Sequence, residues 1–583
     1  MKNTIVSLIS LFCAVVVSCN GQERPVSAPD LVLLHTIDEM ETGEAVTNSH
    51  SGEELESVLQ PVYSSFTTVN HKWLLAEVPA SATDQQTAIY PRIKKLADGR
   101  YMMLYHGGQL GTRCFMTFSK DLISWSDPYM FFGPETVNVD GASDTRRYVN
   151  PDAVVMPDGE IIVVVSFRDT KAYSKNKGGG LKIIRSKDNG KTWGQPELIY
   201  EGTNWEPYLL LLPDGRLHCY FTDCTPMTKN SGTSVIVSSD KGKTWTGKTR
   251  CCRLYKYEYD GPNTQFTGEK IYTDQMPCFR VLNDGKTIFG FLEDRLEEPA
   301  GISGSSYYEM SIVYNDGLEW KDLGEEGAGP QRRQSHLLRG CAGYVSVFPS
   351  GEVVLSSNID RKFSLKIGNA SAEEFQGADW NDGWLKPFNG TGFWGSTEVI
   401  GSHEIVGAMH DTETGIQIGR FRLNHRINSL SKVVVVDGET DEWNLNEALY
   451  ISSTGGVEKV IRSAHDDEYL YLAVDGKSSG GKNGNLDLLL ASEDGGTVCK
   501  VSVSEDGTVS SAADGVFGIS RAAASSSGKA GVVTEIAVPL TLLSDTAPEA
   551  VRISAVLKTG NSSMRFTFAS DSDPDTWQKI SIR

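Results

Sequence analysis

A hairpin signal that recurs five times constrains the fold of this chain more than any other feature. It appears as LADGRYMMLY, MPDGEIIVVV, LPDGRLHCYF, LNDGKTIFGF and FPSGEVVLSS, with turn glycines Gly99, Gly159, Gly215, Gly285 and Gly351. Asp-Gly suits the positive φ of a tight hairpin turn, and the flanking residues alternate as half-buried strands do. The steps of 56 to 70 residues between glycines fit a four-stranded sheet with its loops. Each repeat therefore predicts one propeller blade.

The rest of the chain completes an all-β architecture. Material for a sixth blade lies around residues 393–423 and 69–78, which predicts a propeller at 61–426 closed by strands from both ends. From residue 429 the rhythm changes to VVVVDGETDEW, HDDEYLYLAV, TEIAVPLTLL and SMRFTFAS, separated by Gly- and Ser-rich loops. We expect a six-bladed β-propeller followed by a C-terminal β-sandwich at 429–583.

A second repeat is phased with the first. SKDNGKTW ends at Trp193, SSDKGKTW ends at Trp245, and the weaker FSKDLISW ends at Trp125. The two strict copies resemble the Asp-box of the sialidase superfamily, which implies the sialidase type of propeller. Because the Ser and Asp side chains of such a turn bond the turn's own backbone, Asp188 and Asp240 are expected to be structural rather than catalytic.

The C-terminal region has its own signature. VDGETDEW and TEIAVPLTLL resemble the family 9 type of carbohydrate-binding module. Trp443 belongs to the first segment and is expected in the core, which leaves Trp577, Tyr469 and Tyr471 as candidate aromatic platforms for sugar. Sugar binding and a purely structural role both stay open for this domain.

The N-terminus predicts export. An apolar run at 5–17 follows Lys2, is too short to span a bilayer and suits a signal peptide at 1–18. The sequence Val-Val-Ser-Cys resembles a bacterial lipobox, which implies a lipid anchor on Cys19 and a tether at 19–60; an ordinary secretory signal is the alternative. The expected location is a membrane lipoprotein, facing the periplasm or the cell surface.

Charge and cysteine content exclude several classes. The 55 Lys and Arg against 75 Asp and Glu give a net charge of -20, which disfavours nucleic acid as a partner. The eight cysteines after Cys19 are irregularly spaced and are expected to be buried small hydrophobes, although Cys219 and Cys224 could pair. We expect a monomer without cofactor or metal.

Four segments lead into hairpin turns and are expected to form inner strands: AIYPRIKKLADG, YVNPDAVVMPDG, NWEPYLLLLPDG and DQMPCFRVLNDG. Each carries a polar residue near proline, which predicts that Arg92, Asn150, Glu206 and Gln275 lie around one mouth. Sugar hydrolysis needs two carboxyl groups that flank the scissile bond. Glu206 precedes a proline at a strand start, and Glu293 ends the strand after the fourth turn. A solvated loop glutamate and a salt-bridged strand end are the respective alternatives.

The order of these segments from about residue 90 to 295 resembles the exo-arabinanases of the sialidase-fold clan. The resemblance implies an exo-acting retaining glycosidase, with Glu206 as nucleophile and Glu293 as acid/base, acting on an oligosaccharide or polysaccharide. Trp205, Arg168 and His106 complete the expected substrate-binding residues. The sequence departs from the family at Gln275, where the family has Gly before Met, and in its long loop at 255–273.

Three other functions remain open. An exo-α-sialidase would use Arg92 as the first of three arginines that clamp a carboxylate, although the loop YHGGQLGTR lacks the acid that such enzymes need. A propeller lyase on uronic acid glycans would use His106, His336 or His410 beside arginine. A glycan-binding lipoprotein without catalytic activity would need neither glutamate.

The lipobox yields a direct prediction. Cys19→Ala should move the protein from the membrane fraction to the soluble fraction, because the acyl chains are the only anchor that the sequence indicates. Fractionation and immunoblotting measure this, with Cys13→Ala as the control that should stay on the membrane. Membrane retention of Cys19→Ala would contradict lipidation at that residue.

Overall fold

The computed structural model describes residues 69–73 and, with gaps, residues 88–582. The larger gaps are 225–231, 260–265, 296–307, 377–385, 524–530 and 566–573. The expected signal peptide and tether, with Cys19, lie outside the described residues. The described chain is built almost entirely of strands, with short 3-10 turns such as η2 (Tyr173–Lys175) and η6 (Leu540–Leu542). Within it, no helix has the length and apolar character needed to cross a bilayer.

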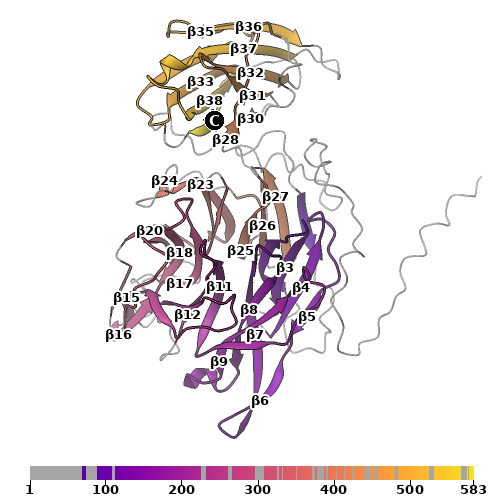
Figure 1. Ribbon diagram of the computed structural model, residues 1–583, viewed down its shortest axis with the longest axis vertical. Coiled ribbons are helices and arrows are strands. Elements are labelled where there is room, and N and C mark those ends of the chain that lie inside the picture. The colour runs from indigo at the N-terminus through magenta and orange to yellow at the C-terminus, as the bar shows by residue number, and fades with distance from the viewer. Residues whose placement is uncertain are drawn as a thin grey trace, which may run out of the picture.

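Six antiparallel sheets form the blades of a propeller (Figure 1). Blades one to three, from the inner strand outward, are β2 (Ala88–Lys95), β3 (Tyr101–Gly107), β4 (Arg113–Ser119) and β5 (Tyr129–Phe132); β7 (Ala142–Val155), β8 (Ile161–Asp169), β9 (Gly179–Ser186) and β10 (Glu197–Glu201), with β6 (Glu135–Val139) beside β7; and β11 (Asn204–Leu211), β12 (Leu217–Asp223), β13 (Thr233–Ser238) and β14 (Thr249–Cys252).

The other three blades repeat this order. They are β17 (Gln275–Val281), β18 (Ile288–Arg295), β19 (Tyr308–Asn315) and β20 (Arg333–Arg339); β21 (Cys341–Val347), β22 (Glu352–Ile359), β23 (Lys362–Ala370) and β24 (Phe375–Gln376); and β25 (Gly392–Val399), β26 (Glu404–Asp411), β27 (Gly415–Arg422) and β1 (Val69–Trp73). A separate hairpin, β15 (Leu254–Tyr259) with β16 (Phe266–Thr273), lies between blades three and four along the chain.

The propeller closes as the sequence predicts. Each inner strand contacts the next, from β2 through β7, β11, β17 and β21 to β25, and β25 contacts β2. The sixth blade takes its outermost strand from the N-terminal side, because β1 pairs antiparallel with β27. All five turn glycines have φ between +70° and +105°, as tight hairpin turns require.

The repeated Ser-x-Asp turns carry the expected internal hydrogen bonds. Ser186 Oγ donates to Asp188 Oδ1 at 2.8 Å, and Asp188 accepts from the backbone N–H of Thr192 at 2.8 Å. The turn at Ser238 and Asp240 repeats these bonds at 2.8 and 2.9 Å. Both turns join the third strand of a blade to the fourth, so they lie at the end of the propeller opposite the starts of the inner strands.

Two sheets that share one core form the C-terminal sandwich. One contains β28 (Arg426–Asn428), β40 (Gln578–Ser581), β38 (Ala550–Thr559), β33 (Asn485–Ser492), β34 (Val498–Val503) and β35 (Val509–Ser511), with β39 (Ser562–Arg565) on β38. The other contains β29 (Leu430–Ser431), β31 (Val457–His465), β32 (Tyr469–Ser478), β37 (Gly531–Pro539) and β36 (Phe517–Ala523), with β30 (Ala448–Ser452) on β31. Because β28 pairs with β40, the sandwich begins at Arg426 rather than at residue 429.

A buried glutamate joins the two signature segments of the sandwich. Glu535 accepts hydrogen bonds from the indole N–H of Trp443 at 2.7 Å and from the backbone N–H groups of Asp437 and Gly438 at 2.7 and 2.6 Å. Trp443 is buried, as the sequence predicts. A buried carboxylate that accepts three hydrogen bonds is a structural element rather than a reactive one.

The aromatic platform predicted for sugar is largely wrong. Trp577 is buried in the core between the two sheets, and Tyr471 is buried and donates its hydroxyl to Asp466 at 2.6 Å. Only Tyr469 remains partly accessible, with its ring 6.1 Å from that of the exposed Phe517. A tryptophan near a chain end can complete a core as readily as a binding face, and the sequence does not distinguish the two.

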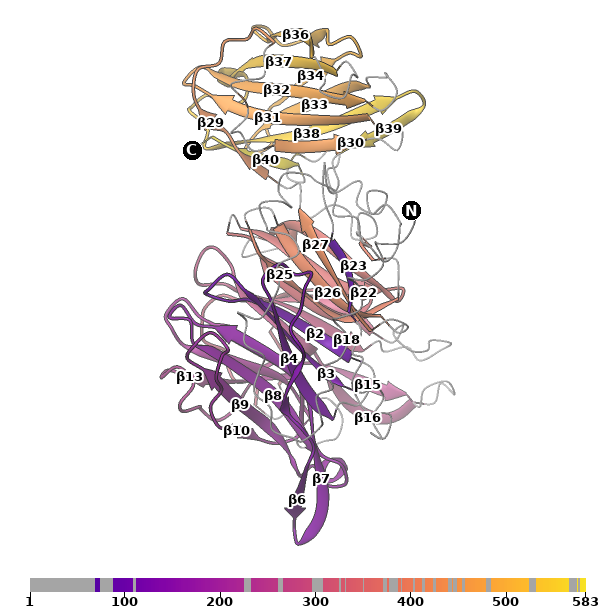
Figure 2. The same ribbon diagram turned by 90° about the vertical axis from the view of Figure 1, so that its right-hand side faces the viewer.

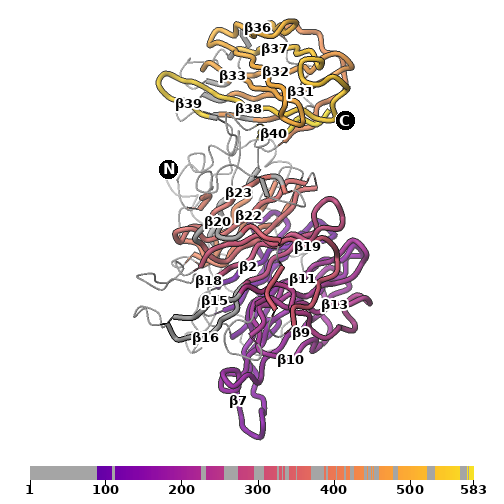
Figure 3. Tube along the Cα trace, turned by 90° about the vertical axis from the view of Figure 1, so that its left-hand side faces the viewer, coloured from indigo at the N-terminus to yellow at the C-terminus, as the bar shows by residue number. Residues whose placement is uncertain are grey.

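The views agree on the arrangement of these parts. The sandwich lies beyond one end of the propeller, on the side of blade six, and the hairpin of β6 and β7 projects at the other end (Figures 2 and 3). Every cysteine among the described residues is buried and free, Cys219 and Cys224 included, which agrees with their predicted role as small hydrophobes.

Candidate active site

All six inner strands contain the same irregularity near their starts. Each has a β-bulge, and in each the bulge contains a non-glycine residue with φ between +44° and +63°. These residues, here called the bulge ring, are Tyr90, Asn150, Glu206, Met276, Ala342 and Trp394. A positive φ in a bulky residue costs free energy and is maintained only where the surrounding structure enforces it. The bulge ring therefore marks the end of the propeller where function is expected.

A second ring of polar side chains lies on the neighbouring strands. The residue before each bulge pairs across the sheet with one of these side chains. The six residues, here called the polar ring, are His106, Ser166, Thr222, Glu293, Asn358 and His410, all of them buried. Glu293 is the only acid among them, as Glu206 is the only acid in the bulge ring.

Hydrogen bonds between blades join the two rings. The backbone N–H of Asn150 donates to His106 Nδ1 at 3.3 Å, that of Met276 to Thr222 Oγ1 at 2.9 Å, and that of Ala342 to Glu293 Oε2 at 2.7 Å. In each case a polar-ring side chain satisfies the bulge of the following blade. These bonds stabilise the strained backbone and fix the acceptor side chains.

Glu206 is positioned by its own blade. Thr222 donates its hydroxyl to Glu206 Oε2 at 2.7 Å and accepts the N–H of Met276, so the carboxylate ends a chain of hydrogen bonds. Oε1 has no hydrogen-bond partner in the described part of the chain. Burial raises the pKa of Glu206 to about 6, against the lowering effects of Thr222, Arg168 and Arg92.

Glu293 is more deeply buried than Glu206, with 4% of its surface exposed. Its Oε1 is hydrogen-bonded to the side-chain amide of Gln275, its cross-strand partner, and its Oε2 accepts from Ala342. Burial raises the pKa of Glu293 to about 7, and the charges of Glu206 and Asp294 contribute to the increase. Because a side-chain amide offers either a donor or an acceptor after rotation, Gln275 can pair with both protonation states of Glu293.

Arginine and tryptophan border Glu206. Arg168 lies over the ring of Trp205, 2.8 Å from its centre, and donates from Nη2 to Asn150 Oδ1 at 3.2 Å. Burial lowers the pKa of Arg168 to about 10. His106 is kept neutral, because burial and the charges of Arg168 and Arg92 lower its pKa to about 3.

Arg92 and Gln275 are not the equivalents of Asn150 and Glu206 that the sequence predicts. Arg92 lies two residues after the bulge residue Tyr90, and its Nη1 donates to the carbonyls of Pro91, Trp394 and Gly395 at 2.9 to 3.1 Å. It therefore supports the backbone of the first and sixth blades. Gln275 precedes the bulge residue Met276 and acts through Glu293.

A count along the sequence could have found both rings. The bulge residue lies nine positions before the turn glycine in each of the first five blades, which identifies Tyr90, Met276 and Ala342. The polar-ring residue lies seven positions after that glycine, or eight in blade four, where it is Glu293. The positions next to the prolines indicate Arg92 and Gln275 instead.

The rest of the bulge ring is apolar. Tyr90, Met276 and Ala342 form a buried cluster against which Trp394 packs. His410 stacks on Trp394, with the rings nearly parallel and 6.0 Å apart, and burial lowers its pKa to about 4. The side chain of His336 lies outside the described residues. The bulge ring thus combines an apolar half with a polar half formed by Asn150 and Glu206.

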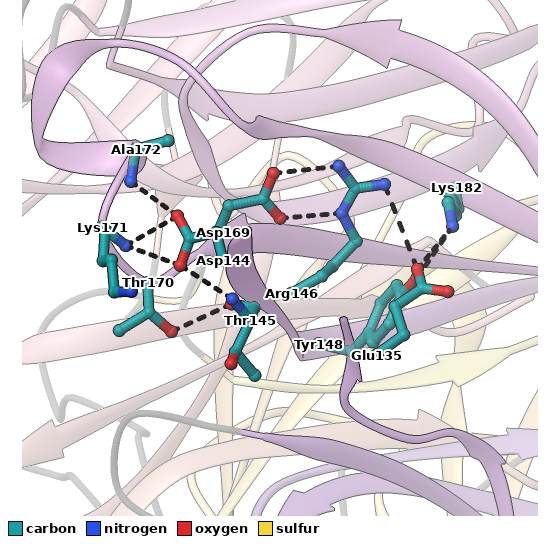
Figure 4. A network of polar contacts seen from close by, with 10 residues as sticks. All are labelled: Glu135, Asp144, Thr145, Arg146, Tyr148, Asp169, Thr170, Lys171, Ala172 and Lys182. Carbon is teal, nitrogen blue, oxygen red and sulfur yellow. Dashed lines mark hydrogen bonds and ion pairs between the residues drawn. The ribbon is translucent and has the colours of Figure 1, made fainter. Parts of the chain in front are cut away.

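The hairpin of β6 and β7 belongs to blade two and leads into the start of its inner strand. Figure 4 shows the polar contacts around it. The part of β7 that pairs with β6 extends past the end of β8 at Asp169. Asp169 is the residue after Arg168, so the hairpin begins beside that arginine. Arg146 forms a two-bonded ion pair with Asp169 at 2.8 and 2.9 Å, and Asp144 accepts from the N–H groups of Lys171 and Ala172, both at 2.9 Å. These contacts fix the hairpin as a wall beside the ring.

A cavity of about 550 Å³ lies at the opposite end of the inner strands. Lys94, Arg280 and Glu398 line it, among apolar residues of several blades. Lys94 forms a buried ion pair with Asp152 at 3.0 Å. Its lining contains a single carboxyl group, Glu398, so it does not offer the pair that sugar hydrolysis requires. No cluster of metal-ligating side chains occurs among the described residues.

The similarity of this chain to known proteins is a similarity of fold. No protein-family description matches the sequence, and a search of curated proteins gave no match. Among solved structures, the chain is similar to an alpha-L-arabinanase of Penicillium chrysogenum complexed with arabinobiose, at 16% identity and a TM-score of 0.41, over 61% of this chain and 98% of that one. It is also similar to the Hadza microbial sialidase Hz136, at 13% identity and a TM-score of 0.41, over 58% and 66% of the two chains. The GH43 protein BlXynB of Bacillus licheniformis matches at 10% identity and a TM-score of 0.31, over 84% and 90%.

The raised pKa of Glu293 predicts an effect on stability. A carboxyl group whose pKa is raised from 4.5 to about 7 stabilises the fold fully below pH 4.5, and this contribution is lost as pH rises to 7. Glu293→Gln should therefore raise the free energy of unfolding by about 3 kcal/mol at pH 8 and by little at pH 4.5. Denaturant unfolding at both pH values measures this, with the exposed Glu201→Gln as control. Equal differences at both pH values would contradict burial as the cause.

Proposed function

We propose that the chain is an exo-acting retaining glycoside hydrolase. The observation that carries this proposal is the pair Glu206 and Glu293, the only acids in the two rings. Both have pKa values raised by burial, both are held by hydrogen bonds, and the charge of Glu206 raises the pKa of Glu293 further. Buried carboxyl pairs with separated pKa values are typical of acid/base chemistry on glycosidic bonds.

The environments support a role for each member. Glu206 has the lower pKa and one oxygen without a hydrogen-bond partner among the described residues, so it is the nucleophile that attacks the anomeric carbon. Glu293 remains protonated to a higher pH and donates its proton to the leaving oxygen. When Glu206 becomes a glycosyl ester its negative charge is lost. The pKa of Glu293 then falls, which suits it to take a proton from the attacking water.

The wall on blade two supports cleavage from a chain end. The hairpin of β6 and β7 lies beside Arg168. Its base is held by the ion pair of Arg146 with Asp169 and by the hydrogen bonds of Asp144 to the backbone of Lys171 and Ala172. A rigid wall beside Arg168, one blade before Glu206, limits how far a polysaccharide can extend on that side.

Two observations bear on the sugar. The resemblance of the sequence to exo-arabinanases favours a neutral arabinan-type glycan, whereas the buried charge of Arg168 favours an acidic one. A non-catalytic glycan-binding role is less well supported, because binding alone does not need two buried carboxyl groups with raised pKa values.

The N-terminal segment and the C-terminal sandwich of the protein also have proposed roles. We propose that Cys19 anchors the exported protein to its membrane through lipid, and that the substrate is a glycan outside the cytoplasm. The sandwich contributes its own core, and Tyr469 with Phe517 is the aromatic pair that remains for contact with polysaccharide.

Replacement of either glutamate should abolish most activity. Glu206→Gln and Glu293→Gln should each lower kcat at least ~100-fold on a cleaved glycan, because a positioned acid or base contributes 10²–10⁴. The wild-type kcat/KM should peak between the two apparent pKa values of about 6 and 7, where Glu206 is ionised and Glu293 protonated.

The controls separate chemistry from folding. Asp188→Asn changes a carboxylate in a Ser-x-Asp turn at the opposite end of the propeller and should leave kcat within a few-fold of wild type if the variant folds. Near wild-type turnover in either glutamine variant, or an inverted anomeric configuration of the first product by NMR, would refute the proposed pair or its retaining mechanism.

A further inference from the structure

Asn150 orients two hydrogen-bond donors at the polar half of the bulge ring. Its backbone N–H donates to His106 Nδ1, and its side-chain oxygen accepts from Arg168 Nη2. Because Nδ1 of the neutral imidazole is the acceptor, the proton of His106 is on Nε2. Neither His106 Nε2 nor Arg168 Nη1 has a hydrogen-bond partner in the part of the chain that the structure describes. Asn150 thus fixes the positions of two donors, His106 Nε2 and Arg168 Nη1, that can donate hydrogen bonds to a ligand.

Arg168 is less well paired than the cations around it. Arg92, which also acts on Glu206, has no ion pair among the described residues but donates to three backbone carbonyls. Lys94 is paired with Asp152 at 3.0 Å, Arg146 with Asp169 at 2.8 Å, Lys248 with Asp223 at 2.6 Å and Arg333 with Asp274 at 2.6 Å. Arg168 is 9% exposed, and no carboxylate of the described residues lies within ion-pair distance of it. Its Nε is also buried without a partner. A buried cation without a counter-ion is costly, and an anionic ligand would offset that cost.

The carboxylate that acts on the charge of Arg168 is that of the proposed nucleophile, Glu206. Arg168 stacks on Trp205, the residue before Glu206, and its charge lowers the pKa of Glu206. A ligand carboxylate attached to the anomeric carbon would lie where Glu206 must attack, and like charges at that distance repel. A carboxylate on the far side of the sugar ring avoids this conflict, because His106 and Arg168 belong to blades one and two, whereas Glu206 and Glu293 belong to blades three and four.

We propose that His106 and Arg168, oriented by Asn150, bind the carboxylate of a terminal hexuronic acid whose anomeric carbon faces Glu206 and Glu293. This inference rests on the proposed hydrolase function for the orientation of the sugar. The guanidinium and the imidazole N–H each donate to the carboxylate, and Trp205 holds the guanidinium plane from one side. The neutral state of His106 is compatible with this role, because it donates from Nε2 without an added proton.

Binding of free sugars tests the proposal without catalysis. The ligands are D-glucuronate and D-galacturonate, with D-glucose and D-galactose as their neutral counterparts, and L-arabinose and N-acetylneuraminate as the alternatives. Calorimetric titration of the Glu206→Gln protein should show at least one uronate binding ~10-fold or more tightly than its neutral counterpart, since charge-assisted hydrogen bonds are about twice as strong as neutral ones.

Variants then locate the preference. Arg168→Gln should remove that ~10-fold preference, whereas Arg168→Lys should keep part of it, because a lysine retains the charge without the planar stacking on Trp205. Arg216→Gln, on the hairpin turn at the opposite end of blade three, is the matched control and should bind as the parent does. Thermal unfolding of each variant shows whether it is folded.

Several outcomes would overturn the proposal. They are equal binding of uronates and neutral sugars, absence of uronate binding altogether, a preference that survives in folded Arg168→Gln, and binding of N-acetylneuraminate in place of uronates. The proposed hydrolase function fails separately. Cleavage of a neutral glycan through Glu206 and Glu293, without a uronate preference, would support the hydrolase function and contradict the uronate site. A uronate preference without cleavage of any glycan would support the uronate site and contradict the hydrolase function.

Discussion

The arrangement of this protein depends on hydrogen bonds from strained backbone to side chains of the preceding blade. Each inner strand turns through a residue of positive φ, and at three of the six positions its N–H donates to a buried polar side chain one blade earlier. The bond satisfies an amide that the bulge removes from the sheet. It also fixes the acceptor, and that is how His106, Thr222 and Glu293 obtain their orientations.

The same geometry accounts for the electrostatic asymmetry between the two glutamates. Glu206 is part of a bulge, so its side chain projects from the start of an inner strand toward Arg168 and Thr222. Burial is the largest influence on both pKa values, but the charges of Arg168 and Arg92 offset it at Glu206, whereas those of Glu206 and Asp294 add to it at Glu293. The neighbouring charges therefore place the pKa of Glu293 above that of Glu206. This separation is what the division into nucleophile and acid requires.

The propeller was predictable because its signals are local. Asp-Gly turns and Ser-x-Asp turns each satisfy their own backbone hydrogen bonds within a few residues. The turns at Gly99 and Asp188 can therefore be predicted without knowing the rest of the fold. Glu206 and Glu293 could be proposed for a related reason, since one precedes a proline at the start of an inner strand and the other ends the strand after a turn glycine. The role of Arg92 could not, because its partners are carbonyls of the sixth blade, about 300 residues away. The burial of Trp577 is not predictable from the sequence, because burial at a chain end depends on sheet packing that the local sequence does not encode.

The separation of the two carboxyl groups tests the central claim most directly. A crystal structure of the protein with a sugar bound at the bulge ring would measure it between Glu206 and Glu293. For a retaining pair formed by the bulge of blade three and the second strand of blade four, we expect about 5 to 5.5 Å, with the anomeric carbon next to Glu206. A separation of about 6.5 Å or more, or a sugar bound at the opposite cavity near Lys94, would contradict this account.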